Sequence, residues 1–423
     1  MNRIVSPWTP GGCVRAIPSK SAAHRLLLCA ALSDRPASLA CPALNDDIRA
    51  TAGCIRALGG DVTYTDGLLQ VTPIGAPCTA RVTLDCGESG STLRFLLPIA
   101  AALGQSAAFT GAGRLSQRPL EPLYSLLCTH GCRLSPEGAF PLLLDGKLPA
   151  GDYEIDGSVS SQFISGLLMA LTAAGGGSVT VTGTFASAPY VALTVSTLRR
   201  AGVTVRQEGR RLTVQGRCRL PDGAVEGDWS AAAFWFAAGA LGKPQVSGLR
   251  VTGLDPDSPQ GDRAILDLLE GMGARVTRFS DGAAVQPPAS GPLRGIEIDA
   301  AQIPDLVPVL AVTAACAEGE TRITHAERLR AKESDRLETT AALLRALGGT
   351  AEVTADGLRI TGRRTLTGGT AEGANDHRIV MAAAVAAVRC ADPVTILGAE
   401  ACAKSYPSFF DDLAALGACI REE

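Results

Sequence analysis

One short pattern recurs six times along this chain: an apolar helix end, then a glycine, then the start of a strand. The pattern is marked by Gly59, Gly131, Gly202, Gly273, Gly348 and Gly417. Neighbouring marker glycines are 72, 71, 71, 75 and 69 residues apart. Six units of this size nearly fill a chain of 423 residues, so one repeated supersecondary unit is expected to build the fold.

The residues around each glycine predict its local structure. A glycine just after a helix adopts the left-handed conformation that caps the last helical carbonyls. Alternating segments follow, as in 62–72, 203–216 and 351–362, with Asp-Gly or Glu-Gly at a turn that favours positive φ. Each unit therefore ends as helix, glycine, strand, turn and strand, and strand and helix signals upstream indicate a mixed α/β unit.

Two globular domains of three units each explain the repeat better than a solenoid, because the period is long for a solenoid. Turn-forming residues gather in 217–230, midway along the chain, and in 6–19. If both segments cross between domains, the first domain contains 1–18 and 226–423 and the second contains 19–225. The N-terminal strand then packs with the C-terminal half.

Several predicted helices are apolar nearly all round and must be buried. They cover 26–32, 93–103, 163–174, 306–317 and 379–388, and dense polar clusters precede them at 19–25, 86–91, 157–162, 303–305 and 373–378. Helix capping explains one Ser, Asp or Asn in each cluster. It does not explain Lys or Arg, which the positive end of the helix dipole disfavours. Cations at these ends indicate that the protein binds anions there.

Taken one at a time, most of these motifs also have ordinary explanations. Lys20 and Arg25 fit solvated charges, and a mixed charge run such as 326–338 is usually a solvated helix face. Arg118 lies on a Pro-restricted segment typical of a surface loop, and Lys404 fits a free surface lysine. Asp305 is an acid that suits a helix dipole.

Composition excludes several classes of function. With 39 basic and 42 acidic residues, the chain has no global field for nucleic acid or an anionic membrane. Thirteen scattered cysteines without a CxxC pair, and four histidines, argue against a zinc site and indicate mostly buried thiols in a reducing compartment. No apolar run approaches the roughly 18 residues of a membrane span, and the start lacks a signal-peptide pattern. We expect a cytoplasmic protein.

Eight motifs, in one consistent order, resemble those of the 5-enolpyruvylshikimate-3-phosphate synthase family. They are SKSxxxR from Ser19, GxSGSTLR from Gly87, QRPLxPL from Gln117, DGSxSSQFISGLLMA from Asp156, IPD from Ile303, RLRxKESDR from Arg328, NDHR from Asn375 and AKSYPxFF from Ala403. Each motif is modest in information, but eight in order are specific and extend over nearly the whole chain.

The resemblance implies an α/β (α+β) fold of two similar domains, each of three βαβαββ units in an inside-out α/β barrel, with the active site in the cleft between them. It implies transfer of the enolpyruvyl (carboxyvinyl) group of phosphoenolpyruvate to the 5-hydroxyl of shikimate 3-phosphate by addition and elimination, with release of phosphate. This reaction belongs to chorismate and aromatic amino-acid biosynthesis, and glyphosate inhibits it. The resemblance implies no cofactor and no metal. We expect a monomer.

The same resemblance assigns the binding residues. Shikimate 3-phosphate would be held by Lys20, Ser21, Arg25, Ser160, Ser161, Gln162, Ser187, Asp305 and Lys332. Phosphoenolpyruvate would lie against Lys20, Gly90, Arg118, Gln162, Arg336, Arg378 and Lys404. A Cβ atom at Gly90 is expected to crowd phosphoenolpyruvate and its analogues.

Three residues are candidates for proton transfer. Asp305 is the candidate base toward the 5-hydroxyl, Glu333 the candidate acid and later base at the methylene carbon, and Lys20 a competing candidate for part of that role. Neighbouring Lys and Arg are expected to keep both carboxylates ionised until ligands bind. The role of Arg328 stays open, because some members of the family carry Asn at that position.

Two other functions compete with this one. UDP-N-acetylglucosamine enolpyruvyl transferase uses a cysteine in a mobile loop, and the corresponding segment 111–123 contains none. A non-catalytic polyanion or RNA-end binder could use similar repeats, but the nearly neutral charge and the lack of aromatic stacking platforms disfavour it.

Overall fold

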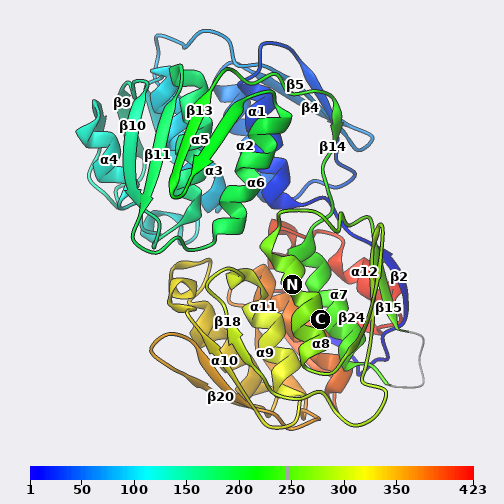
Figure 1. Ribbon diagram of the computed structural model, residues 1–423. Helices are drawn as coiled ribbons and strands as arrows, with labels where there is room; N and C mark the ends of the chain where they lie inside the picture. Colours follow the sequence, from blue (N-terminus) through cyan, green and yellow to red (C-terminus); the bar gives the residue numbers. More distant parts are fainter. Residues whose placement is uncertain (244–247) are drawn as a thin grey trace. The chain divides into compact units, whose positions relative to one another are not determined.

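The computed structural model describes residues 1–243 and 248–423. The chain forms two compact units (Figure 1). Unit 1 comprises Met1–Ser19 and Glu226–Glu423, and unit 2 comprises Lys20–Val225. Ser19 lies with unit 1, because its N–H donates to the carbonyl of Glu226 at 2.7 Å. The chain therefore passes from one unit to the other twice.

Within the described residues, the strands form six four-stranded sheets of one topology, three in each unit. In one of them, β10 (Gly151–Asp156) is parallel to β11 (Gly177–Thr182), and β13 (Arg211–Gln215) is antiparallel to both β11 and β12 (Thr204–Glu208). One helix connects the first strand to the second, and another connects the second strand to the hairpin. This is a βαβαββ unit, and the expected α/β fold built from six of them is confirmed.

The elements of unit 2 follow this order through three repeats. The first has α1 (Lys20–Ala31), β3 (Ala37–Ala40), α2 (Asp46–Ala57), β4 (Asp61–Thr65) and β5 (Leu68–Thr72). The second has β6 (Val82–Asp85), α3 (Gly90–Leu103), β7 (Ala107–Thr110), η1 (Leu115–Gln117), α4 (Leu123–Thr129), β8 (Cys132–Leu134) and β9 (Leu142–Gly146). The third adds α5 (Ser161–Ala174) and α6 (Ala188–Arg200) to β10–β13, and β14 (Gly223–Ala224) follows.

Unit 1 repeats the same order. After β1 (Arg3–Val5) and β2 (Gly12–Arg15), its first repeat has α7 (Trp229–Leu241), β15 (Leu249–Thr252), η2 (Gly261–Ala264), α8 (Ile265–Gly271), β16 (Arg275–Phe279) and β17 (Gly282–Gln286). The second has β18 (Glu297–Asp299), η3 (Pro304–Leu306), α9 (Val307–Ala315), β19 (Glu320–Thr324), η4 (Glu327–Ala331), α10 (Arg336–Ala346), β20 (Thr350–Val353) and β21 (Leu358–Thr361). The third has β22 (Gly369–Glu372), α11 (His377–Ala386), η5 (Ala387–Arg389), β23 (Val394–Leu397), η6 (Ala399–Lys404), α12 (Phe409–Ala415) and β24 (Ile420–Glu422).

Strands from distant parts of the sequence complete three of the sheets. Strand β1 lies between β23 and β24, so the two ends of the chain share a sheet. Strand β2 is parallel to β15, and β14 is parallel to β3. The segments 6–19 and 217–230 are therefore not only linkers: they carry β2 and β14, and α7 already begins at Trp229.

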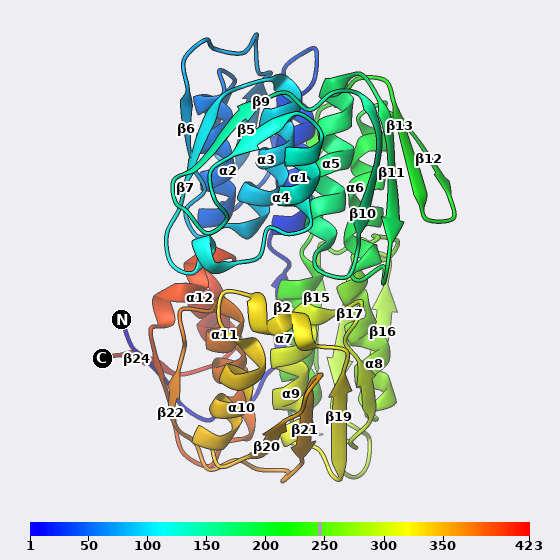
Figure 2. The ribbon, with the colours of Figure 1, turned by 90° about the vertical axis from the view of Figure 1, so that its left-hand side faces the viewer.

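The helices fill the interior of each unit and the sheets lie outside them (Figures 1 and 2). Every residue of α9 and of α11 is buried, and these two helices and α7 contact one another. The prediction that helices apolar nearly all round are buried is confirmed for α9 and α11. Helix α7, which sequence reasoning did not identify, is equally buried apart from Ser230.

All six marker glycines have positive φ, from 77° at Gly202 to 104° at Gly417, which confirms the predicted helix caps. The hairpin turns also contain positive φ at Asp66, Gly67 and Gly209. The prediction is wrong for the turn at 356–357, where neither residue has positive φ. That turn is wider: four residues separate β20 from β21, whereas two separate β4 from β5.

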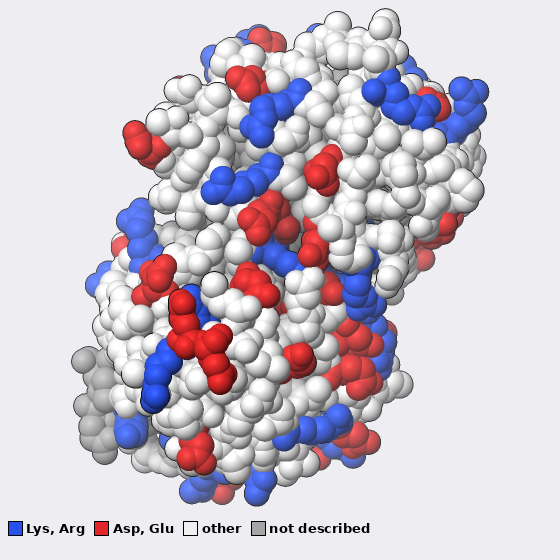
Figure 3. Space-filling model, turned by 180° about the vertical axis from the view of Figure 1, so that it is seen from behind, with Lys and Arg blue, Asp and Glu red and all other residues white. Residues whose placement is uncertain are grey.

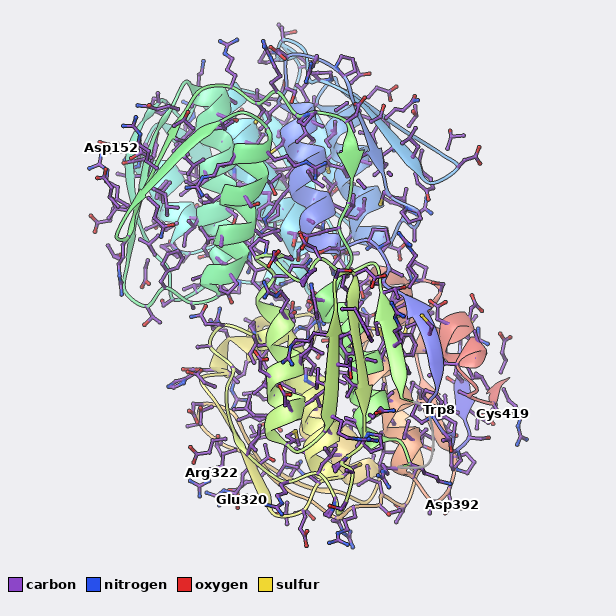
Figure 4. All side chains as sticks on the ribbon, turned by 45° about the vertical axis from the view of Figure 1, so that its right-hand side comes forward. Trp8, Asp152, Glu320, Arg322, Asp392 and Cys419 are labelled. Atoms are coloured by element: carbon purple, nitrogen blue, oxygen red, sulfur yellow. The ribbon has the colours of Figure 1, made fainter. Side chains whose placement is uncertain are left out.

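The surface and the thiols fit the composition. Both signs of charge occur over the face shown in Figure 3. Glu320 and Arg322 form an exposed ion pair at 2.9 Å on β19, where Figure 4 labels them.

Nine of the thirteen cysteines are buried thiols, as predicted. Among the described helices, none has both the length and the apolar character that crossing a bilayer requires.

Candidate active site

One buried guanidinium, that of Arg336, binds three carboxylates in unit 1. Its Nη1 donates to Asp305 Oδ1 at 2.8 Å, its Nη2 to Glu333 Oε2 at 2.6 Å, and its Nε to Asp376 Oδ2 at 2.8 Å. Only 2% of the Arg336 side chain is exposed. Burial alone would lower the pKa of Arg336, but the carboxylates of Asp376, Glu333 and Asp305 outweigh it and raise that pKa above the ordinary value.

Asp305 pairs with three cations of this cluster, more than either of the other two carboxylates that bind Arg336. It lies in η3, directly before α9; its Oδ2 is 3.1 Å from Arg378 Nη2, and its Oδ1 is 3.5 Å from Lys332 Nζ. Burial alone would raise the pKa of Asp305, but Arg378, Lys332 and Arg336 hold it well below the ordinary value. The surrounding cations therefore favour the ionised form of Asp305.

A break in the helical backbone turns Glu333 and Arg336 inward. The segment 326–338 is not one solvated helix: η4 ends at Ala331, Lys332 is extended, and Asp335 caps α10 by accepting from two backbone N–H groups. The ordinary expectation of a solvated face is wrong here, because capping by Asp335 places Arg336 in the buried first turn. Arg328 donates to the carbonyl of Ala301 at 2.7 Å.

The start of α11 completes the unit 1 cluster. Asp376, which has no exposed surface, caps the helix by accepting from the N–H of Arg378 at 3.0 Å. Asn375 precedes it with φ of 52°, and its carbonyl accepts from Lys404 Nζ at 2.7 Å. Lys404 is thus tied to the same helix start as Arg378 and is not a free surface lysine.

In unit 2, Lys20 and Arg25 lie on α1 and both have partners within the unit. Lys20 Nζ is 2.9 Å from Asp47 Oδ2, and both side chains are mostly buried. Arg25 donates from Nε to Thr194 Oγ1 at 2.7 Å and from Nη2 to the carbonyl of Tyr190 at 2.9 Å. Its Nη1 donates to the carbonyl of Ser21 at 2.7 Å. Burial lowers the pKa of Arg25 to about 10, so the side chain is charged at neutral pH.

The remaining predicted residues of unit 2 lie at helix starts. Gly90 begins α3, Ser160 caps α5, Ser161 and Gln162 follow it, and Ser187 precedes α6 with φ of 53°. Arg118 follows η1 and is 8% exposed, so it is not part of a solvated loop. Its guanidinium lies directly against Gly90.

Three carboxylates of these clusters were missed from the sequence. In the sequence, Asp376 fits only a helix cap, and Asp47 and Asp262 carry no motif signal. Asp262 accepts a hydrogen bond from Ser230 Oγ. Burial and the negative charge of Asp305 raise its pKa to about 7, although Arg378 opposes this. Among the described residues, no group of three or more His, Cys, Asp or Glu is arranged to hold a metal ion.

Comparisons with known proteins agree with these observations. The sequence model of the EPSP synthase (3-phosphoshikimate 1-carboxyvinyltransferase) family matches residues 10–413. The 3-phosphoshikimate 1-carboxyvinyltransferase of Clostridium kluyveri is 39% identical over 423 residues, which cover 99% of this chain and 98% of that one. The enzyme of the same name from Methanocorpusculum labreanum is 38% identical and covers 100% of both chains.

A solved structure gives the same result. The EPSP synthase of Acinetobacter baumannii has a TM-score of 0.80 and 27% sequence identity, with 100% of both chains covered. The family match over most of the chain and the full-length relatives at nearly 40% identity leave one assignment. This chain belongs to the EPSP synthase (3-phosphoshikimate 1-carboxyvinyltransferase) family.

Proposed function

We propose that this enzyme transfers the carboxyvinyl group of phosphoenolpyruvate to the 5-hydroxyl of shikimate 3-phosphate and releases phosphate. Family membership supports this reaction, which serves chorismate and aromatic amino-acid biosynthesis. The observation that carries the proposal is the unit 1 cluster, in which Arg336 and Arg378 share Asp305. It combines the cations that an anionic substrate requires with carboxylates that can transfer protons.

The binding residues are those assigned from the resemblance. Shikimate 3-phosphate is held by Lys20, Ser21, Arg25, Ser160, Ser161, Gln162, Ser187, Asp305 and Lys332. Phosphoenolpyruvate is held by Lys20, Gly90, Arg118, Gln162, Arg336, Arg378 and Lys404. Several cations among them already pair with carboxylates of the protein, so substrates gain contacts partly by sharing these cations. Arg25 acts as a buried positive charge, because its Nε and both Nη atoms already donate within unit 2.

The chemistry needs a base and an acid. Asp305 accepts the proton of the 5-hydroxyl as the oxygen attacks the second carbon of phosphoenolpyruvate, while the methylene carbon is protonated. A proton then leaves the new methyl group and the carbon–oxygen bond to phosphate breaks, which restores the double bond. The ionised state of Asp305 suits the base. Glu333 is the acid and later the base at the carbon, with Lys20 as the competing group.

The positive charge of Arg336 affects the protonation of Glu333 during the reaction. Its Oε2 accepts from Arg336 Nη2 at 2.6 Å, which favours the ionised carboxylate. Glu333 must therefore gain its proton as the anionic substrates bind beside it. Only then can it deliver that proton to the methylene carbon.

A phosphate-release assay tests the proposal. Release should require both phosphoenolpyruvate and shikimate 3-phosphate, and replacement of shikimate 3-phosphate by UDP-N-acetylglucosamine should abolish it. Filter binding with RNA in parallel should detect no retention. Release without shikimate 3-phosphate, or none with both substrates, would refute the assignment.

We also propose that the enzyme is a cytoplasmic monomer. The thirteen free thiols favour a reducing compartment. Sedimentation of the purified protein at two concentrations tests the monomer.

A further inference from the structure

We propose that Arg94 is a positioning residue that fixes Gln162 and the segment after Arg118 in the arrangement that phosphoenolpyruvate needs. This inference rests on the proposed function, because it takes Gln162 and Arg118 as contacts of that substrate. Arg94 itself is assigned no contact with either substrate.

The contacts of Arg94 join three elements of unit 2. Arg94 lies on α3 and is 5% exposed. Its Nη1 donates to Gln162 Oε1 at 2.9 Å, and its Nη2 donates to the carbonyl of Pro119 at 2.8 Å. The guanidinium carbon is 5.2 Å from the centre of the Phe163 ring. One buried cation thus ties α3 to the start of α5 and to the residue that follows Arg118.

This arrangement fixes which way the amide of Gln162 points. A guanidinium only donates hydrogen bonds, so the atom facing Arg94 must be the carbonyl oxygen of Gln162. The other end of the amide, Nε2, donates to Ser91 Oγ at 2.8 Å. Rotation of the amide would place N–H groups against the guanidinium. Arg94 and Ser91 together therefore hold both ends of the side chain.

The backbone around Arg94 allows helices α3 and α5 to approach each other closely. Pro98 lies one turn later in α3 and has no N–H to donate to the Arg94 carbonyl. On α5, a Cβ atom at Gly166 would lie 2.5 Å from that carbonyl oxygen and 3.0 Å from Pro98 Cγ. Gly166 therefore lets the backbones of α3 and α5 meet beside Arg94. The two helix starts are held at a fixed spacing at this point.

Residues at the start of α3 therefore include or contact every unit 2 residue that is assigned to phosphoenolpyruvate, except Lys20. Gly90 contacts the Arg118 guanidinium, Ser91 binds Gln162, and Arg94 binds Gln162 and Pro119. If Arg94 loses its forked contacts, Gln162 and the Arg118 segment become free to move apart. The affinity for phosphoenolpyruvate should then fall more than that for shikimate 3-phosphate, because phosphoenolpyruvate loses two positioned contacts, Gln162 and Arg118, and shikimate 3-phosphate loses only Gln162.

Steady-state kinetics of Arg94→Lys test this role. Lysine keeps the charge, but a single ammonium cannot reproduce the planar fork. We expect the KM for phosphoenolpyruvate to rise about tenfold and that for shikimate 3-phosphate less than about threefold. The matched control is Arg211→Lys, which alters an exposed pair with Asp152 on an outer sheet (Figure 4) and should change neither KM.

A double-mutant cycle separates positioning from general damage. In a Gln162→Ala background, Arg94→Lys should have a clearly smaller effect on the KM for phosphoenolpyruvate, because its main contact is already gone. Equal effects in both backgrounds, or an unchanged KM in the single variant, would overturn the proposal. If Arg94→Lys does not fold, Ser91→Ala replaces it: a two- to fivefold rise in that KM supports the role, and no rise overturns it. A wild type without phosphate release would instead refute the proposed function itself.

Discussion

Gly90 and the guanidinium of Arg118 are in direct contact: a Cβ atom on Gly90 would lie 2.6 Å from Nη1 and 2.7 Å from Cζ of Arg118. The sequence suggested that such a Cβ would crowd the ligand. The structure adds that it would first displace a residue assigned to the same ligand. Because the obstructed atoms are the end of a long side chain, the protein can adjust by moving Arg118 and need not unfold.

Gly90→Ala should therefore affect binding and leave stability nearly intact. We expect the KM for phosphoenolpyruvate to rise on the order of tenfold, and inhibition by glyphosate to weaken at least as much, because Arg118 is pushed out of place. Steady-state kinetics with an inhibitor titration measure both. The control is Gly53→Ala in α2, where a Cβ meets nothing within 4 Å. Unchanged inhibition in Gly90→Ala would place Gly90 away from the ligand.

Glu333→Gln should lower kcat by about 10²–10⁴-fold and change the KM values little, because the amide still accepts from Arg336 but cannot transfer a proton. Single-turnover measurements would locate the loss in the chemical step. Glu338→Gln, at an exposed carboxylate in the first turn of α10, is the matched control. A variant that binds substrates poorly but turns over normally would remove Glu333 from the chemistry.

Asp262 should make the stability of unit 1 depend on pH. Its carboxyl has a pKa of about 7 in the folded protein against an ordinary value of 3.8, so the folded state retains the proton to higher pH. Its contribution to stability is then complete below about pH 4 and is lost as the pH rises to about 7. Asp262→Asn, which removes this titration, should gain stability relative to the wild type between pH 5 and pH 8, on the order of 2 kcal/mol.

Denaturant unfolding at the two pH values measures this difference. All three tryptophans, Trp8, Trp229 and Trp235, are buried in unit 1, so their fluorescence reports on that unit. Asp267→Asn, at an exposed carboxylate of the same unit, is the control. A stability difference for Asp262→Asn that is the same at both pH values would contradict the prediction.

The enzyme should keep full activity in excess EDTA. Asp305, Glu333 and Asp376 direct their oxygens to Arg336, so arginine and lysine supply the positive charge of the cluster. Phosphate release after dialysis against the chelator checks this, with added Mg²⁺ as the comparison. Loss of activity that Mg²⁺ restores would refute it.

Much of the fold follows from local physical chemistry that a sequence displays. The six marker glycines adopt positive φ because a helix end needs a residue without a Cβ there. Helices such as α9 and α11 are buried because no polar face is available to meet water. The same signals reveal less about Trp229–Leu241, whose start looked like a linker because turn-forming residues precede it.

Part of the candidate site could likewise be predicted from the sequence, and part could not. Motifs located Asp305, Glu333, Arg336 and Gln162, since each lies at a helix start or within three residues before one, in a recognisable pattern. The partners of these residues come from far along the chain: Arg336 binds Asp376, Lys20 binds Asp47, and Arg94 orients Gln162. Such pairs depend on how helices pack, and no local pattern encodes them.

By itself, the sequence determined the repeat, the helix caps, the buried helices and the family motifs, because each depends on residues within a few positions of one another. The tertiary structure alone decided that the pKa of Asp262 is raised, that Gly90 lies against Arg118, and that β1 pairs with β23 and β24 in particular. Charge, steric contact and strand pairing act through space, so they are set only once distant segments have packed together.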